Sequence, residues 1–136
     1  MSNLEQTLSI IKPDAVERNL ESEIKEIFKS KGFSILKEKK IQIDKTEAEK
    51  FYKVHETKPF YNDLCAYLSS GPIVAMILEK GDAVIENRKL MGATNPNDAE
   101  EGTIRKKYGI SIDKNSVHGS DSVENAKIEI DFFFKD

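Results

Sequence analysis

Apolar and polar positions along the chain recur with two different periods, and these predict its helices and strands. Thr7 to Ile11 is predicted as a short strand, apolar on both faces, that ends at Lys12-Pro13. Apolar positions from Leu20 to Lys31 follow helical spacing, and Gly32 suits the end of that helix. The segment from Phe33 to Ile43 predicts a longer and more polar strand, which we expect to be partly exposed.

The middle of the chain predicts three helices around one buried strand. Thr46 and Glu49 match a capping box, with Thr46 as the N-cap of a helix. Pro59 can start another short helix that reaches Leu68. Ile73 to Leu78 is an uninterrupted apolar run and predicts a central buried strand. Asp82 is expected to cap a helix that continues to Met91.

The last third of the chain begins with an irregular segment. Residues 92–102 form a predicted loop, and a short helical turn opens near Arg105. The segment from Asn115 to His118 predicts a strand. Asp121 and Glu124 resemble a second capping box, which would start the amphipathic helix from Val123 to Phe134.

Four strands with helices inserted between them define the expected fold class. The order predicts an α+β fold of the ferredoxin-like, split βαβ kind, with a four-stranded antiparallel sheet covered by helices. The length of 136 residues allows one compact domain, which we expect to span residues 1–136.

Composition narrows the function classes. Hydrophobic residues make up 38% and charged residues 33% of the chain, as in a globular protein. The net charge of −3 disfavours a nucleic-acid binder. No apolar run reaches the roughly 18 residues of a membrane span, and the first residues do not resemble a signal peptide. Cys65 is the lone cysteine, so the sequence predicts no internal disulfide and a cytoplasmic location.

His118 is the residue that best combines position and chemistry. It follows small polar residues, precedes Gly119, and lies shortly before a predicted helix, where unpaired N–H groups favour an anion. A histidine there can be a structural turn residue or a nucleophile, and periodicity leaves both open. With a reference pKa of about 6.5, imidazole is largely neutral and nucleophilic at pH 7. His55 lies on an apolar stripe and is interpreted as structural.

Three cations accompany this histidine in the sequence. Lys12, Arg88 and Arg105 can each be a solvated surface residue, or together they can bind a polyphosphate. Sequence spacing does not decide between these interpretations. The chain contains neither a Walker A motif nor a G-x-G-x-x-G motif, so a nucleotide would not be held by a P-loop or a Rossmann turn. No cysteine or second histidine stands near His118 with the spacing of a zinc site.

One motif identifies a family. The segment from Asn115 to Asp121 resembles the N-x-x-H-G-S-D active-site signature of nucleoside diphosphate kinases. The resemblance continues in order along nearly the whole chain. Its further motifs are Thr7-Leu8-Ser9-Ile10-Ile11-Lys12-Pro13-Asp14, Lys58-Pro59-Phe60-Tyr61, Ser70-Gly71-Pro72-Ile73-Val74-Ala75-Met76, Gly92-Ala93-Thr94-Asn95-Pro96 and Gly102-Thr103-Ile104-Arg105.

The resemblance implies an activity. It implies ping-pong transfer of the γ-phosphoryl group between nucleoside triphosphates and diphosphates, through a pros-phosphohistidine at His118 and with broad base specificity. Lys12 and Tyr52 would lie beside the transferred group, and Glu129 would support Ser120 and the histidine. The residues expected to bind the nucleotide are Lys12, Phe60, Arg88, Thr94, Arg105, Ile112 and Asn115.

The resemblance also implies a cofactor and an assembly. Mg²⁺ would be bound mainly through the nucleotide phosphates, and no metal ligand is expected from protein side chains. The partners would be nucleoside di- and triphosphates, with neither nucleic acid nor membrane. The chain would form a homo-oligomer built from dimers, either a hexamer or a tetramer.

Two other function classes remain as alternatives. A nucleotide-sensing protein on the same fold would bind without catalysis, although such a protein is expected to lose some of the site residues. An RNA-binding domain of ferredoxin-like fold would need exposed aromatic side chains on its sheet and a basic surface. The acidic charge balance disfavours the latter.

Overall fold

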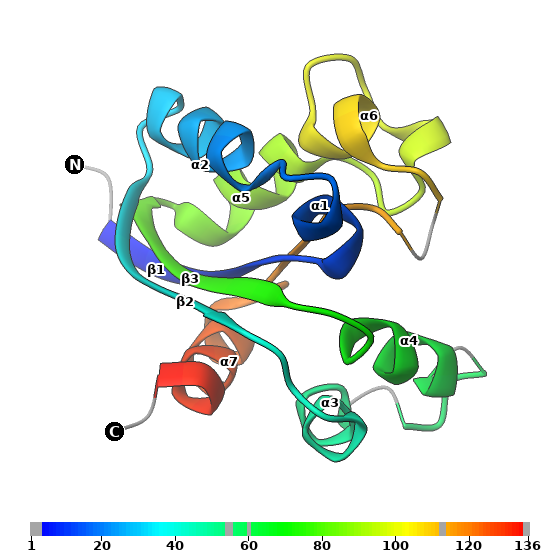
Figure 1. The fold of residues 1–136 in the computed structure, drawn as a ribbon. Helices are drawn as coiled ribbons and strands as arrows, with labels where there is room; N and C mark the ends of the chain where they lie inside the picture. Colours follow the sequence, from blue (N-terminus) through cyan, green and yellow to red (C-terminus); the bar gives the residue numbers. More distant parts are fainter. Residues whose placement is uncertain (1–3, 54–55, 60, 112–113, 135–136) are drawn as a thin grey trace.

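The computed structural model describes residues 4–53, 56–59, 61–111 and 114–134. Its centre is a four-stranded antiparallel sheet with helices on both faces (Figure 1). The strands lie in the order β2-β3-β1-β4, which is the ferredoxin-like arrangement expected from the sequence. Their bounds are β1 Leu4–Ile11, β2 Ser34–Ile41, β3 Ile73–Gly81 and β4 Val117–Gly119.

The two central strands are β1 and β3, and their pairing reflects their apolar sequences. The whole of β1 pairs with β3, from Leu4 opposite Gly81 to Ile11 opposite Val74. The apolar run predicted as a central buried strand is therefore confirmed. The short β4 forms one edge of the sheet, where His118 lies opposite Ile10 of β1.

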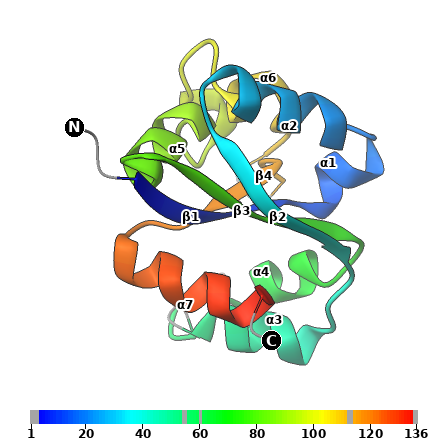
Figure 2. The ribbon, with the colours of Figure 1, turned by 90° about the vertical axis from the view of Figure 1, so that its left-hand side faces the viewer.

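Helices cover both faces of the sheet, as Figures 1 and 2 show from two directions. Each face holds its own cluster of buried apolar side chains. The helices packed on the face that buries Phe28 and Met76 are α1 Pro13–Glu17, α2 Glu21–Ser30, α5 Ala83–Met91 and α6 Ile104–Tyr108. Those on the face that buries Leu8 and Ala75 are α3 Lys45–Phe51, α4 Tyr61–Leu68 and α7 Val123–Phe134.

Gly32 ends α2 as the sequence predicts. Its φ of +89° lies in the left-handed region that glycine adopts without a steric penalty. Beyond it, the N–H of Phe33 donates to the carbonyl of Phe28 at 3.0 Å, the bond of a Schellman motif. The chain then enters β2, whose side chains are mostly exposed, as expected.

The predicted N-caps differ from those in the structure. Helix α3 is capped by Asp44, whose carboxylate accepts from the N–H of Glu47 at 2.8 Å, so the assignment to Thr46 and Glu49 was wrong. At α7, the Oγ of Ser122 accepts from the N–H of Asn125 at 3.1 Å, in place of the predicted Asp121 and Glu124 pair.

Asp82 occupies the N-cap position of α5, but its side chain makes no capping hydrogen bond. Its backbone is left-handed, with φ of 55°. The carboxylate of Glu5 in β1 accepts from the N–H of Val84 instead, at 3.0 Å. A backbone N–H group in the first turn of α5 is therefore paired with a side chain from the sheet.

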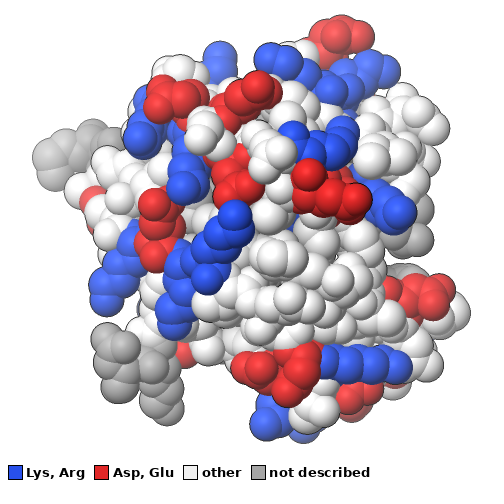
Figure 3. All heavy atoms as spheres, viewed as in Figure 1, with Lys and Arg blue, Asp and Glu red and all other residues white. Residues whose placement is uncertain are grey.

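The surface carries both signs of charge. Figure 3 shows lysine and arginine side chains interspersed with acidic ones over one face of the molecule. On β2, Lys40 forms an ion pair with Glu21 at 3.1 Å, and Glu38 pairs with Lys25 at 2.8 Å. No helix within the described residues is both long and apolar enough to span a membrane. Because helices pack on both faces, the sheet lacks the open face that RNA-binding domains of this topology use.

Candidate active site

His118 lies on edge strand β4 with its side chain 20% exposed. Its Nε2 is 3.0 Å from the Oε1 of Glu129 in α7. The ring of Phe51 meets the imidazole edge to face at 5.4 Å between centroids, and that of Tyr52 does so at 6.2 Å. Because an ionised carboxylate can only accept hydrogen bonds, this contact places the proton of a neutral imidazole on Nε2. Nδ1 then carries the lone pair.

Ser120 ties Glu129 to the sheet. The serine is fully buried, and its Oγ donates to the same Oε1 of Glu129 at 2.9 Å. It also accepts from the N–H of Leu8 at 3.3 Å, while its own N–H donates to the carbonyl of Leu8 at 3.2 Å. The carboxylate beside the histidine is thus positioned by both α7 and β1.

Lys12, Asn115 and Thr94 form a connected group. Lys12 follows β1 directly and is only 5% exposed. Its Nζ donates to the Oδ1 of Asn115 at 3.0 Å, and the Nδ2 of Asn115 donates to the carbonyl of Thr94 at 3.0 Å. The structure therefore brings Lys12 together with Thr94 and Asn115, although Lys12 and Asn115 are 103 positions apart in the sequence.

Arg105 is buried near the start of α6. Its Nη1 donates to the carbonyl of Gly92 at 3.0 Å and its Nη2 to that of Val117 at 2.9 Å. Burial lowers the pKa of Arg105 to about 10, and the nearby charge of Arg88 contributes in the same direction. The guanidinium remains a cation at neutral pH.

Tyr52 is buried beside these charges. Burial raises the pKa of Tyr52 well above its usual value, and the negative charge of Glu129 raises it further, while Arg105 acts in the opposite direction. At neutral pH its hydroxyl therefore keeps its proton and can donate a hydrogen bond.

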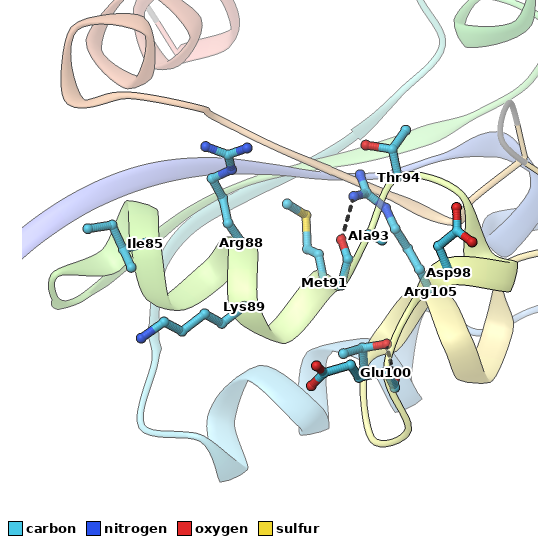
Figure 4. Close-up of a pocket in the computed structure, with 11 residues that line it drawn as sticks. Ile85, Arg88, Lys89, Met91, Ala93, Thr94, Asp98, Glu100 and Arg105 are labelled. Atoms are coloured by element: carbon cyan, nitrogen blue, oxygen red, sulfur yellow. Dashed lines mark hydrogen bonds between the residues drawn. The ribbon is translucent and has the colours of Figure 1, made fainter.

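Arg88, Thr94 and Arg105 line one open cavity of about 700 Å³. In Figure 4, the guanidinium groups of Arg88 and Arg105 and the side chain of Thr94 lie on the same side of the cavity, whereas Lys89 extends away from them. A volume of this size suits a small ligand, for which pockets span roughly 300–1,000 Å³. Two guanidinium groups at one wall favour an anionic ligand.

Comparison with known proteins decides the family. A family profile described as nucleoside diphosphate kinase matches residues 5–136. The chain belongs to the nucleoside diphosphate kinase family.

Relatives and solved structures agree with this assignment. A nucleoside diphosphate kinase of Campylobacter jejuni is 56% identical over 132 residues, covering 97% of this chain and 96% of the relative. The corresponding protein of Persephonella marina is 53% identical, with coverage of 97% and 94%. The crystal structure of the Aquifex aeolicus nucleoside diphosphate kinase superposes with a TM-score of 0.96 at 38% identity, covering 98% and 96% of the two chains. The expected family, enzyme class and ferredoxin-like fold are confirmed.

The roles of individual residues in this chain stay predictions. The expected residues Phe60 and Ile112, and the histidine interpreted as structural, His55, lie outside the described residues.

Periodicity identified neither Phe51 nor Ser116 as part of the site. Phe51 stands among apolar positions at helical spacing, a pattern that a core residue also shows. Ser116 has a φ of +77°, and a serine before a valine gives no sequence signal of a left-handed backbone.

Proposed function

We propose that this chain transfers the γ-phosphoryl group from a nucleoside triphosphate to a nucleoside diphosphate through a phosphohistidine on Nδ1 of His118. The observation that carries the proposal is the 3.0 Å contact between His118 Nε2 and Glu129, because it directs the lone pair to Nδ1. In the first half-reaction, Nδ1 attacks the γ-phosphorus and the bond to the β–γ bridging oxygen breaks. The diphosphate leaves, and a terminal oxygen of a second diphosphate then takes the phosphoryl group from Nδ1.

The cations supply what this reaction needs besides a nucleophile. Phosphoryl transfer depends on in-line positioning and charge neutralisation more than on covalent machinery. We assign Arg88, Arg105 and Thr94 to the β- and γ-side oxygens, because all three line one cavity. Lys12 and Asn115 are assigned to the sugar and phosphate end, where their 3.0 Å hydrogen bond aligns them.

Tyr52 and Lys12 are placed beside the transferred group. The raised pKa of Tyr52 supports a donor role for its hydroxyl. Phe60 and Ile112 are proposed to hold the base between them, as expected from the family resemblance. Stacking is worth about 1–3 kcal/mol per base and does not depend on base identity, which fits broad specificity.

Mg²⁺ is proposed to arrive with the nucleotide, bound mainly by its phosphates. Within the described ranges, no group of three His, Cys, Asp or Glu side chains is arranged to hold a metal ion. We propose a homo-oligomer built from dimers, a hexamer or a tetramer. Native mass measurement distinguishes the two sizes. The cytoplasmic location stays a prediction.

The experiment that tests the function is formation of the phosphoenzyme. Wild-type protein is incubated with γ-labelled ATP and Mg²⁺ and quenched in base, which preserves a phosphohistidine. We expect an acid-labile labelled protein that transfers its label to an added nucleoside diphosphate, and no label in His118→Ala. An unlabelled wild type would remove the mechanism and favour the non-catalytic nucleotide binder. Equal labelling of His118→Ala would also remove the mechanism, because the phosphoryl group would then be carried by another residue.

A further inference from the structure

Ser116 has an unusual backbone conformation and lies between two residues that contact the candidate active site. It is fully buried and has a φ of +77°, a conformation that residues other than glycine seldom adopt. Its neighbours in sequence are Asn115, which contacts Lys12, and Val117, whose carbonyl accepts from Arg105. A conformation of this kind persists only when surrounding contacts hold it.

Those contacts come from a cluster made of Asp14, Arg18, Tyr67 and Ser116, here called the Asp14 cluster. Ser116 Oγ donates to the Oδ2 of Asp14 at 3.0 Å. Arg18 Nη2 donates to the same Oδ2 at 3.1 Å and to Ser116 Oγ at 3.2 Å. The hydroxyl of Tyr67 donates to the other oxygen of Asp14 and accepts from its N–H at 2.8 Å. The serine hydroxyl is therefore held from two sides.

The backbone of Ser116 in turn holds the candidate active site. Its carbonyl accepts from the N–H of Lys12 at 2.9 Å. The side chain of Lys12 contacts Asn115, and the guanidinium of Arg105 is anchored on Val117. A change in φ at position 116 would turn Asn115 and Val117 relative to each other, and would displace both cations.

Charge and burial keep the hydrogen bonds of the Asp14 cluster in place. The Asp14 side chain is 4% exposed and that of Arg18 is 36% exposed, so the carboxylate is shielded from water by its own partners. Burial, followed by the hydrogen bond to Asp14, raises the pKa of Tyr67. The tyrosine therefore stays a donor over the physiological range.

We propose that Ser116, held by Asp14 and Arg18, is a positioning residue for phosphoryl transfer. This inference rests on the proposed function of His118. If Ser116 were purely structural, its contacts would hold α1 against the segment before β4, and their loss would not affect the reaction. A positioning role would keep Lys12, Asn115 and Arg105 in the geometry that the phosphates require, and its loss would slow the chemical step in folded protein.

The test compares three substitutions by rapid-quench labelling of His118 with γ-labelled ATP, well below the melting temperature of each variant. Ser116→Ala removes the hydroxyl and keeps the unfavourable φ, so we expect labelling about tenfold slower at saturating ATP. Ser116→Gly removes the hydroxyl but adopts this φ freely, so it should recover part of the rate. Asp14→Asn should slow labelling in the same direction. Ser30→Ala is the matched control, because the Ser30 hydroxyl donates to the carbonyl of Ile27 within α2, and it should match the wild type.

Two outcomes overturn the inference. One is a labelling rate for Ser116→Ala and Asp14→Asn within twofold of the wild type, even if their melting temperatures are lowered. Such a result would show that these residues stabilise the fold without affecting the reaction. The other is a slower rate for Ser116→Gly than for Ser116→Ala, because the hydroxyl would then not be supporting the backbone conformation. Failure of the wild type itself to label is a different result and contradicts the proposed function.

Discussion

Glu129→Gln is the substitution that most directly tests how the histidine is activated. Glu129 Oε1 accepts from Ser120 at 2.9 Å and lies 3.0 Å from His118 Nε2, and its side chain is 17% exposed. As Nδ1 binds phosphorus, the imidazole gains positive charge, which a carboxylate stabilises and a neutral amide does not. A glutamine can also turn its NH₂ group toward Nε2. That orientation favours the tautomer with its proton on Nδ1, which is not nucleophilic at that atom.

The expected loss of rate in Glu129→Gln follows from the kinds of hydrogen bond involved. Bonds to a charged group contribute about 1.5–3 kcal/mol, against about 0.5–1.5 kcal/mol for neutral pairs. Replacing the carboxylate by an amide of the same shape should therefore cost about 1–1.5 kcal/mol at the transition state, or roughly tenfold in rate. Glu129→Ala removes both contacts and should cost roughly 10²-fold.

The assay is the single-turnover rate of His118 labelling. Glu124→Gln is the matched control, because Glu124 is exposed on the same helix and should label at the wild-type rate. Nitrogen NMR of the imidazole gives an independent measurement of the tautomer, with Nε2–H expected in the wild type and a larger Nδ1–H share in Glu129→Gln. A Glu129→Gln enzyme that labels within twofold of the wild type would refute this account of histidine activation.

Two further predictions concern charge and stability. Arg105→Ala should lower kcat/KM on the order of 10²-fold or more, as loss of a preorganised charge contact does; steady-state kinetics measures this, and near-wild-type turnover would identify Arg105 as uninvolved. Asp44→Ala should lower the free energy of unfolding by about 1 kcal/mol in urea because it removes the N-cap of α3, whereas Thr46→Ala should change it little, and the opposite order would contradict the observed cap.

The fold could be predicted from the sequence because its determinants are local. The apolar run from Ile73 to Leu78 can only be buried, and it forms most of the central strand β3. Gly32 marks the end of α2 because few other residues adopt its φ at low cost. The exposed character of β2 follows from its lysines.

The helix starts show where local patterns stop being sufficient. Asp44 with Glu47 and Thr46 with Glu49 both match a capping box, two residues apart. The structure selects Asp44. Which pair acts depends on where the chain leaves β2, and that is fixed by packing of the sheet. At α5, the N–H of Val84 is satisfied by Glu5 from a strand that is distant in sequence, a contact that spacing does not reveal.

Some residues of the candidate site could be predicted from the local sequence, and others could not. His118 stands out in the sequence through its neighbours and its place before a helix. The partners that define its chemistry come from elsewhere: Glu129 lies eleven positions further along the chain, and only the family resemblance distinguished it from a solvated helix residue. Ser116 had no signal at all, because its role depends on Asp14 and Arg18 at the other end of the chain.

The positively charged side chains of the candidate site differ in their hydrogen-bond partners. Arg105 donates to two neutral backbone carbonyls, and Lys12 Nζ donates to a neutral amide oxygen. The two carbonyl contacts of Arg105 fix the direction of its guanidinium without cancelling its charge, which is what the proposed contact with phosphates requires. Arg18 is different, because the carboxylate of Asp14 accepts from it at 3.1 Å and neutralises it locally. Because Arg88 lowers the pKa of Arg105, the two guanidinium groups repel each other in the free protein. Under the proposed function, a polyphosphate bound between them would relieve that repulsion, so we expect a triphosphate to bind more tightly than a monophosphate.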